Sequence, residues 1–118
     1  MGQYVILFPA DNEGEWTAGT PADHQATYDT DEEFVRRLSA LGGAVRGGAE
    51  LTASARARTL RRGPASTPLV TEGPFAETAE QLSGFYLVTC DDYDELVEAA
   101  GVLLRAHPVV EIRPVEES

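Results

Sequence analysis

The chain has 118 residues, which is enough for one domain and too few for two. Its residues are 42% hydrophobic and 25% charged, which predicts a folded protein with a core rather than a disordered chain. The net charge of −11 opposes contact with phosphate backbones and anionic membrane surfaces, so we expect neither nucleic acid nor a membrane as a partner.

The basic residues are unevenly distributed, and all nine of them are Arg. Seven lie in residues 36–62, where Glu50 is the single acid, and both flanks are acidic. This stretch could bind an anion or a partner, but a solvated face that pairs with the acidic flanks is the favoured interpretation. The absence of Lys excludes Schiff-base chemistry and a P-loop lysine.

The sequence has no feature of export or membrane insertion. Met1–Ala10 lacks the basic start of a signal peptide, and no apolar run approaches the roughly 20 residues of a membrane span. Cys90 is the only cysteine, so we expect no disulfide within the chain and interpret it as a small buried hydrophobic residue. We therefore expect a cytoplasmic protein.

The first two elements are a strand and a long helix, separated by a polar loop. Gln3–Phe8 is apolar on both faces, which predicts a central strand covered on both sides. Thr20–Asp23 has the pattern of a capping box with Pro at the first helical position, and Gly42 predicts the end of the helix after Leu41. Asp31 lies on the apolar stripe of this helix, which is an unusual place for a carboxylate. The stripe consists of Tyr28, Phe34, Val35, Leu38 and Leu41.

Short strands are predicted in the middle of the chain. We expect them at Ala44–Leu51, at Ala55–Arg61 as a half-exposed strand, and at Pro68–Thr71, with a turn over Arg62–Ser66. Phe85–Cys90 is a stronger strand, rich in aromatic and β-branched residues.

A second helix and a last strand complete the chain. Asp91 and Asp92 cap the helix, which must end near His107 because Pro108 follows. Its apolar stripe consists of Tyr93, Leu96, Val97, Ala100 and Leu104. Val109–Val115 is predicted as the last strand.

The order of these elements predicts an α+β, ferredoxin-like fold, with two helices on one face of a mainly antiparallel sheet. Such a sheet leaves its other face without cover. A homodimer that buries this face is the simplest physical remedy, so we expect a homodimer.

Val70–Val88 carries a resemblance to a known family. It contains a Gly-Pro-Phe turn, a Phe-Ala-Glu-Thr run, Glu-Gln-Leu, and Gly-Phe-Tyr leading a strand. This segment resembles the signature of the YCII-related family, in its DGPF-type branch, with Glu72 where that branch usually has Asp. The rest of the chain is similar in its opening Tyr-Val-Ile-Leu strand and at residues 47–51, 57–59 and 110–114.

The resemblance implies one YCII-like domain over residues 1–118 and a dimeric α-β barrel. It also implies that a His on the first helix and an Asp near the end of the second form an acid/base pair in some members. Aligned by segments, these positions correspond to Asp31 and His107 here, so the two groups are exchanged. If the alignment is shifted by one turn, His24 or Asp29 becomes the relevant helix residue.

The residues themselves suit proton transfer at such a pair, since a carboxylate beside an imidazole sets the tautomer of the ring. The competing interpretation is that Asp31 is a solvated helix residue and that His107 only ends a helix. Tyr28 and Arg58 are candidates for orienting a substrate, although an exposed strand charge is the favoured interpretation of Arg58. Glu72 could face a pocket, but we favour a role in capping backbone N–H groups of its turn.

Two function hypotheses follow. The first is a cofactor-free, isomerase- or lyase-like enzyme that uses Asp31 and His107 on a small ring substrate, as the resemblance implies for a few relatives. The second is a non-catalytic dimer that binds a small ligand or a regulatory protein, because some family members are associated with sigma-factor genes. Two His and one Cys give no metal-ligand spacing, so we expect no metal site.

Overall fold

The computed structural model describes residues 2–10, 16, 18–76 and 81–116. Most of the predicted polar loop after residue 10, and residues 77–80 of the family signature, lie outside the described residues. The strands and helices are β1 (Gly2–Ala10), α2 (Pro21–Ala40), β2 (Ala44–Glu50), β3 (Arg58–Arg62), β4 (Pro68–Glu72), β5 (Gln81–Cys90), α3 (Tyr93–Ala100) and β6 (Glu111–Pro114). Short 3₁₀ turns occur at Ser54–Arg56, Pro64–Ser66 and Gly101–Arg105.

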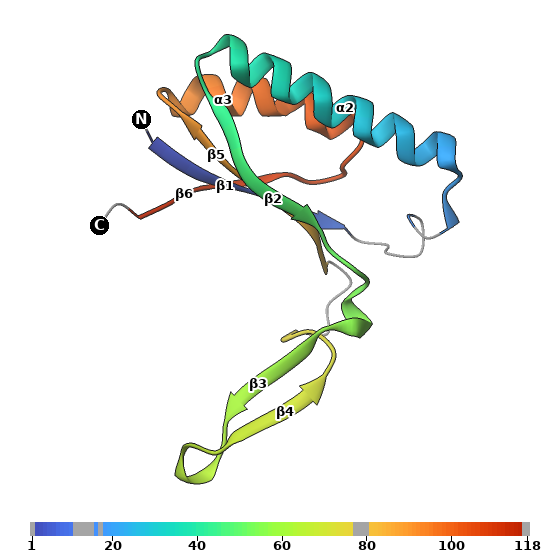
Figure 1. Ribbon diagram of the computed structural model, residues 1–118, viewed down its shortest axis with the longest axis vertical. Coiled ribbons are helices and arrows are strands. Elements are labelled where there is room, and N and C mark those ends of the chain that lie inside the picture. Colours follow the sequence, from blue (N-terminus) through green and yellow to red (C-terminus); the bar gives the residue numbers. More distant parts are fainter. Residues whose placement is uncertain (1, 11–15, 17, 77–80, 117–118) are drawn as a thin grey trace.

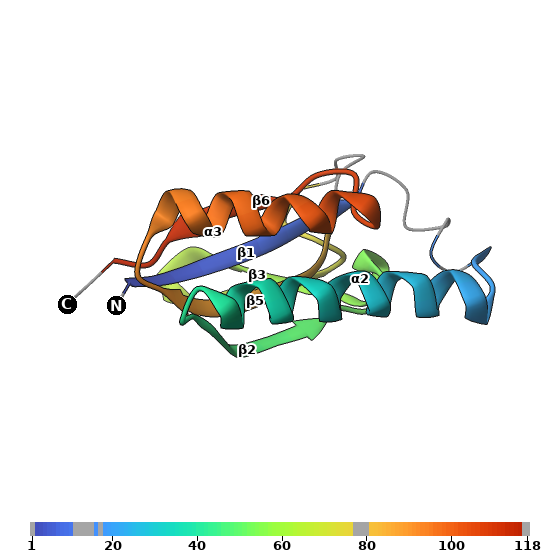
Figure 2. The same ribbon diagram turned by 90° about the horizontal axis from the view of Figure 1, so that it is seen from above.

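Four of the strands form one antiparallel sheet in the order β2-β5-β1-β6. Both helices lie side by side on one face of this sheet (Figures 1 and 2). This arrangement confirms the predicted α+β, ferredoxin-like fold. The strand order also places the end of β1 next to both β5 and the segment that leads into β6, where the candidate site lies.

The core lies between the helices and the sheet. Tyr4, Ile6 and Phe8 alternate along β1 and point toward the helices, where they are buried. Phe34 and Leu38 of α2 are fully buried against this layer. Residues on the opposite face of β1 are only partly covered, so the prediction of a strand buried on both sides is confirmed for one side of the single chain.

The predicted stripes of the helices are only partly correct. On α2, only Phe34 and Leu38 of the predicted stripe are fully buried in the core, and Tyr28 and Val35 are exposed. After α3 the chain tightens into a 3₁₀ turn, which has three residues per turn instead of 3.6. Within α3 the buried residues are Leu96, Ala99 and Ala100, whereas Tyr93 and Val97 are exposed. The 3₁₀ turn rotates the apolar side further, so Val102 and Leu103 are buried and Leu104 is exposed.

The start of α2 follows its sequence signal closely. The Thr20 hydroxyl accepts a hydrogen bond from the Asp23 amide, and the Asp23 carboxylate accepts one from the Thr20 amide. These bonds hold the pKa of Asp23 below its usual value. The capping box thereby determines where α2 begins.

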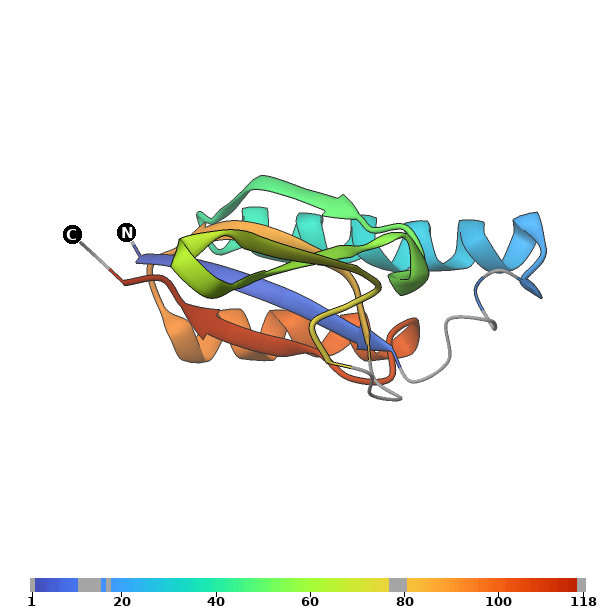
Figure 3. The same cartoon turned by 90° about the horizontal axis from the view of Figure 1, so that it is seen from below.

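Between β2 and β5 the chain leaves the main sheet. Strands β3 and β4 pair only with each other, from Arg58 opposite Glu72 to Arg62 opposite Pro68. This hairpin, residues 58–72, is called the arm below, and it projects from the side of the sheet opposite the helices (Figures 1 and 3). The predicted strand Ala55–Arg61 was wrong at its start, because residues 54–56 form a 3₁₀ turn.

Two further predictions concern Cys90 and membranes. The Cys90 side chain is fully buried, as expected for a small hydrophobic residue. Among the described residues, no helix is both long enough and apolar enough to cross a membrane.

Candidate functional site

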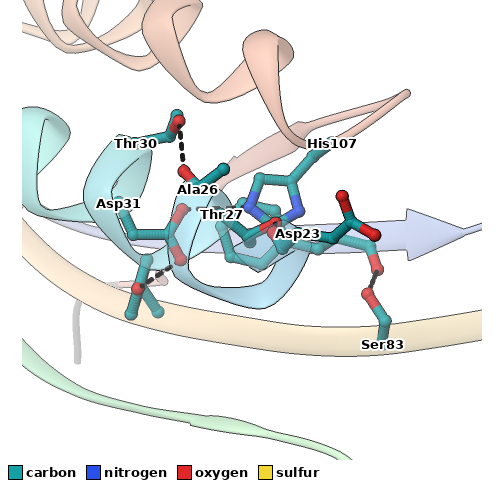
Figure 4. Close-up of polar contacts among 9 residues, drawn as sticks. Asp23, Ala26, Thr27, Thr30, Asp31, Ser83 and His107 are labelled. Atoms are coloured by element: carbon teal, nitrogen blue, oxygen red, sulfur yellow. Dashed lines mark hydrogen bonds and ion pairs between the residues drawn. The ribbon is translucent and has the colours of Figure 1, made fainter. Parts of the chain in front are cut away.

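Asp31 and His107 meet although 76 positions separate them in the sequence. Asp31 projects from the middle of α2, and His107 follows the 3₁₀ turn after α3. The imidazole Nε2 lies 3.0 Å from Asp31 Oδ1, and the two side chains are only 17% (Asp31) and 15% (His107) exposed. Figure 4 shows the carboxylate directed at the ring. The structure therefore brings together the two residues predicted as a pair.

Tyr86 completes the hydrogen bonding of this carboxylate. Its phenol on β5 donates to Asp31 Oδ2 over 3.0 Å. Burial, followed by the negative charge of Asp31 and this hydrogen bond, raises the pKa of Tyr86 well above its usual value. Tyr86 thus remains a donor, and both oxygens of Asp31 are held in place.

The imidazole of His107 is also positioned by an aromatic ring that stacks on its face. The Phe8 ring stacks on His107 with the centroids 4.2 Å apart, and the edge of Phe8 meets Tyr86 at 90°. His107 contacts Asp31 through Nε2, and among the described residues no hydrogen bond engages Nδ1. That nitrogen is therefore available to a ligand.

Gly48 allows β2 to pass close to this group. It lies opposite Tyr86 in the sheet with a φ of +152°. A Cβ at this position would lie 2.5 Å from the Phe85 carbonyl oxygen and 2.6 Å from Tyr86 Cδ1. Only glycine fits there without displacing the strand or the Tyr86 ring.

The pair lines a cavity of about 450 Å³, a volume typical of small-molecule sites. Helix α2, the end of β1, the neighbouring parts of β2 and β5, and the segment around His107 form its walls. The aromatic residues of the lining are Phe8, Trp16, Tyr28, Phe85 and Tyr86, together with the imidazoles of His24 and His107.

A second group of side chains lies along α2 toward its start. The Trp16 indole stacks on His24 at 3.9 Å between ring centroids, and its carbonyl oxygen is 2.8 Å from His24 Nε2. Tyr28 lies edge-on to Trp16 and donates its hydroxyl to Glu50 Oε2 over 3.1 Å. This hydrogen bond raises the pKa of Tyr28. All four residues line the same cavity as the Asp31–His107 pair.

The other predicted site residues fall in two places. Tyr28 lines the cavity, whereas Arg58 and Glu72 lie opposite each other at the base of the arm and do not. The alternative helix residues are also separated: Asp29 is exposed and accepts a hydrogen bond from Gln25, and His24 contacts Trp16. Asp31 is thus the residue of α2 that contacts His107.

Sequence reasoning missed several residues of this site. No role in the site is predicted from the sequence for Tyr86, Trp16 or Glu50, and His24 is considered only as an alternative to Asp31. The alternation of β5 could have placed Tyr86 on the same face as the buried Val88, toward the helices. No local pattern indicates that Glu50 reaches Tyr28, because the two lie on different elements.

A carboxylate in contact with an imidazole can hold and move a proton. Among the described residues, no three His, Cys, Asp or Glu side chains are placed to bind a metal ion. A fixed carboxylate that orients an imidazole in the lining of a cavity is a geometry suited to general acid/base chemistry.

Two comparisons with known proteins bear on the family of this chain. The family model described as YCII-related domain matches residues 3–117. An uncharacterized protein of Rhizobium meliloti (strain 1021) is 40% identical over 94 residues, which cover 72% of this chain and 75% of that protein. The residues that the family model matches include both Asp31 and His107.

Proposed function

The chain belongs to the YCII-related domain family, and from this premise we propose that it is a cofactor-free enzyme that transfers a proton within a small ring substrate. The 3.0 Å contact between Asp31 and His107, made inside a cavity, is the observation that carries the proposal. The signature in residues 70–88 further favours the DGPF-type branch of the family.

In this proposal His107 exchanges the proton and Asp31 orients it. Nδ1 takes a proton from a carbon next to a carbonyl group and returns it to another atom of the substrate, which is the chemistry of an isomerase or a lyase. Asp31 stabilises the imidazolium that forms in between, as carboxylates do in other acid/base pairs. Tyr86 and Phe8 are positioning residues, because they hold the carboxylate and the ring.

The test is exchange of substrate hydrogen with solvent. Ring ketones and lactones are incubated with the protein in D₂O, and loss of the signal of the C–H next to the carbonyl is followed by proton NMR. We expect the wild-type protein to accelerate exchange for part of this panel. His107→Gln should slow it by roughly 10² to 10⁴-fold, the usual contribution of a general acid/base.

Asp29→Asn is the matched control for Asp31→Asn, since both replace an aspartate of α2 and only Asp31 faces the cavity. The control should exchange like the wild type, whereas Asp31→Asn should be slowed. Equal rates for the wild type and His107→Gln would exclude proton transfer by this pair.

The competing function is a binding module without turnover, for which the same cavity serves a small ligand or the protein acts through a regulatory partner. Burial of the pair favours the enzyme, because a shallow, solvated pair would be expected for a surface that only binds proteins. Saturable ligand binding with no exchange in any variant would favour the module.

We also propose that the chain forms a homodimer through the arm and the uncovered face of the sheet. Leu60 of the arm is 64% exposed, Leu69 and Val70 are also exposed, and Phe75 next to its base is 75% exposed, so this region offers apolar area that the chain leaves in water. The basic arm and the acidic remainder of the chain are complementary in charge.

Light scattering after gel filtration tests this dimer and should give twice the mass of one chain. Leu60→Asp should shift the protein toward a single chain. A monomeric wild-type protein would exclude the dimer.

A further inference from the structure

The charge of the cavity restricts what it can bind. Three carboxylates belong to its lining, those of Asp23, Asp31 and Glu50. All nine Arg lie within the described residues, none of them lines the cavity, and the chain has no Lys. The only cations that the lining can supply are the imidazoles of His24 and His107. Even with both of them protonated, the three carboxylates leave the lining negative.

This balance opposes an anionic ligand. A carboxylate entering the cavity would meet like charges at short range and would lack the bidentate Arg that proteins use to bind such groups. The chain as a whole, at −11, adds a repulsive field outside the cavity. Ring carboxylates are therefore poor candidates for this site.

The aromatic lining has the opposite preference. Trp16 and Tyr28 lie edge-on to each other with centroids 6.0 Å apart, and Tyr28 holds Glu50 through its hydroxyl. Aromatic faces attract cations, Trp most strongly, and a carboxylate beside them adds a charge partner. Only one oxygen of Glu50 is engaged by Tyr28, so the other is free among the described residues to accept from a ligand.

The position of this group along α2 gives the site two ends. His24, Tyr28 and Asp31 follow each other at spacings of four and three residues, so they share one face of the helix. The seven residues from His24 to Asp31 span about 10 Å along the helix. The Trp16–His24 stack and the Asp31–His107 pair are therefore separated by roughly the length of a substituted ring. A single small ligand can contact both ends.

We propose that the cavity binds a small organic cation, a protonated amine on a ring or other apolar body, with the ammonium group at Glu50 beside Trp16 and Tyr28. The body of the ligand then extends toward His107. The inference rests on the proposed function only in that it assigns the substrate class of the same cavity. The binding preference stands without any turnover.

Three probes of similar size and different charge test it. Benzylamine, benzyl alcohol and benzoate are titrated at pH 7, and binding is followed by the fluorescence of Trp16, the only tryptophan of the chain. We expect benzylamine to bind at least about tenfold more tightly than benzyl alcohol, and benzoate to bind most weakly. Benzoate binding as tightly as benzylamine, or no binding of benzylamine, would overturn the proposal.

Glu50→Gln removes the charge and retains the shape of the side chain. It should weaken benzylamine about tenfold and change benzyl alcohol by less than about twofold. Glu98→Gln, on the exposed side of α3 and outside the cavity, is the matched control and should bind all three probes like the wild type. An unchanged affinity for benzylamine in Glu50→Gln would contradict the assigned position of the ammonium group.

His107→Gln separates this inference from the proposed reaction. It should slow hydrogen exchange by roughly 10² to 10⁴-fold and weaken benzylamine far less than Glu50→Gln does, because Glu50, Trp16 and Tyr28 are intact. Amine binding without exchange in the wild type would support the cation site and exclude the reaction. Exchange that depends on His107, together with equal affinity for benzylamine and benzyl alcohol, would support the reaction and overturn the cation site.

Discussion

The arm differs from the body of the molecule, by which we mean the four-stranded sheet and its two helices. Both contain large apolar residues, but the body buries them and the arm exposes them. Phe34 of the body is fully buried, and Phe75, next to the base of the arm, is 75% exposed. In the body, Tyr86 and His107 each contact one oxygen of the Asp31 carboxylate. In the arm, the two strands pair with each other and most of their side chains are exposed to water. The body thus packs its apolar side chains within the chain, whereas the arm leaves its apolar side chains exposed, which is what the proposed dimer requires.

The largest expected difference in the free energy of unfolding is between variants of these two phenylalanines. Phe34→Ala should lower the free energy of unfolding by about 3–5 kcal/mol, because it leaves a cavity in the core. Phe75→Ala should lower it by less than about 0.5 kcal/mol for the single chain. Urea unfolding at low protein concentration, followed by circular dichroism, measures both. A large loss in Phe75→Ala under these conditions would mean that the arm contributes to the fold of the body.

A glycine pair tests how tightly the body is built around the site. Gly48→Ala should cost about 1–3 kcal/mol and displace Tyr86, because its Cβ would overlap the Phe85 carbonyl and the Tyr86 ring. Gly47→Ala, one residue earlier, meets nothing within 4 Å and should be neutral or slightly stabilising. Thermal unfolding compares the two variants, and equal stability would show that β2 adjusts freely at this point.

Tyr86→Phe should cost about 1.5–3 kcal/mol at neutral pH, since it removes one hydrogen bond to a carboxylate. The pKa of Tyr86 is raised in the folded protein, so its stabilising contribution is complete below the usual tyrosine pKa of about 10 and is lost as the pH rises through the folded-state value. The free energy of unfolding should therefore fall above pH 10 more steeply in the wild type than in Tyr86→Phe. Parallel pH profiles would contradict the assigned contact.

The smallest effect is expected in the arm. The guanidinium of Arg61 lies 5.0 Å from the centre of the Phe75 ring in an exposed position. Arg61→Ala should change the free energy of unfolding by less than about 1 kcal/mol, and the neighbouring Arg62→Ala by less still. Urea unfolding at raised protein concentration would sharpen the comparison, because a larger effect there than at low concentration would place the arm in an interface between chains.

Local signals predicted the elements of the body well. The capping box at Thr20–Asp23 set the start of α2, and Asp92 set the start of α3 through a bond to the Glu95 amide. Such signals act within a few residues, so they can be found in a sequence. The contact of Asp31 with His107 is different, because it was anticipated from a family resemblance and from the odd place of Asp31, and it forms only through the fold.

The parts that escaped prediction depend on partners distant in the sequence. The tightening of the chain after Ala100 rotated the buried side of the second helix, which made Leu104 exposed and Leu103 buried. Tyr86 reached Asp31 from another element, and Glu50 reached Tyr28 in the same way. These contacts depend on the register between β2 and β5, and hydrophobic alternation alone does not determine which residues of the two strands lie opposite each other.

By itself the sequence determined the fold class and the ends of α2, because capping, periodicity and turn residues act over short distances, and the family resemblance indicated that Asp31 and His107 form a pair. Only the tertiary structure decided that the pair is buried, that its carboxylate is held from both sides, and that the cavity around it is aromatic and free of Arg among the described residues. The physical reason is that burial and charge at a site are sums over side chains from several elements. Those sums exist only when the strands are in register and the helices are packed on them.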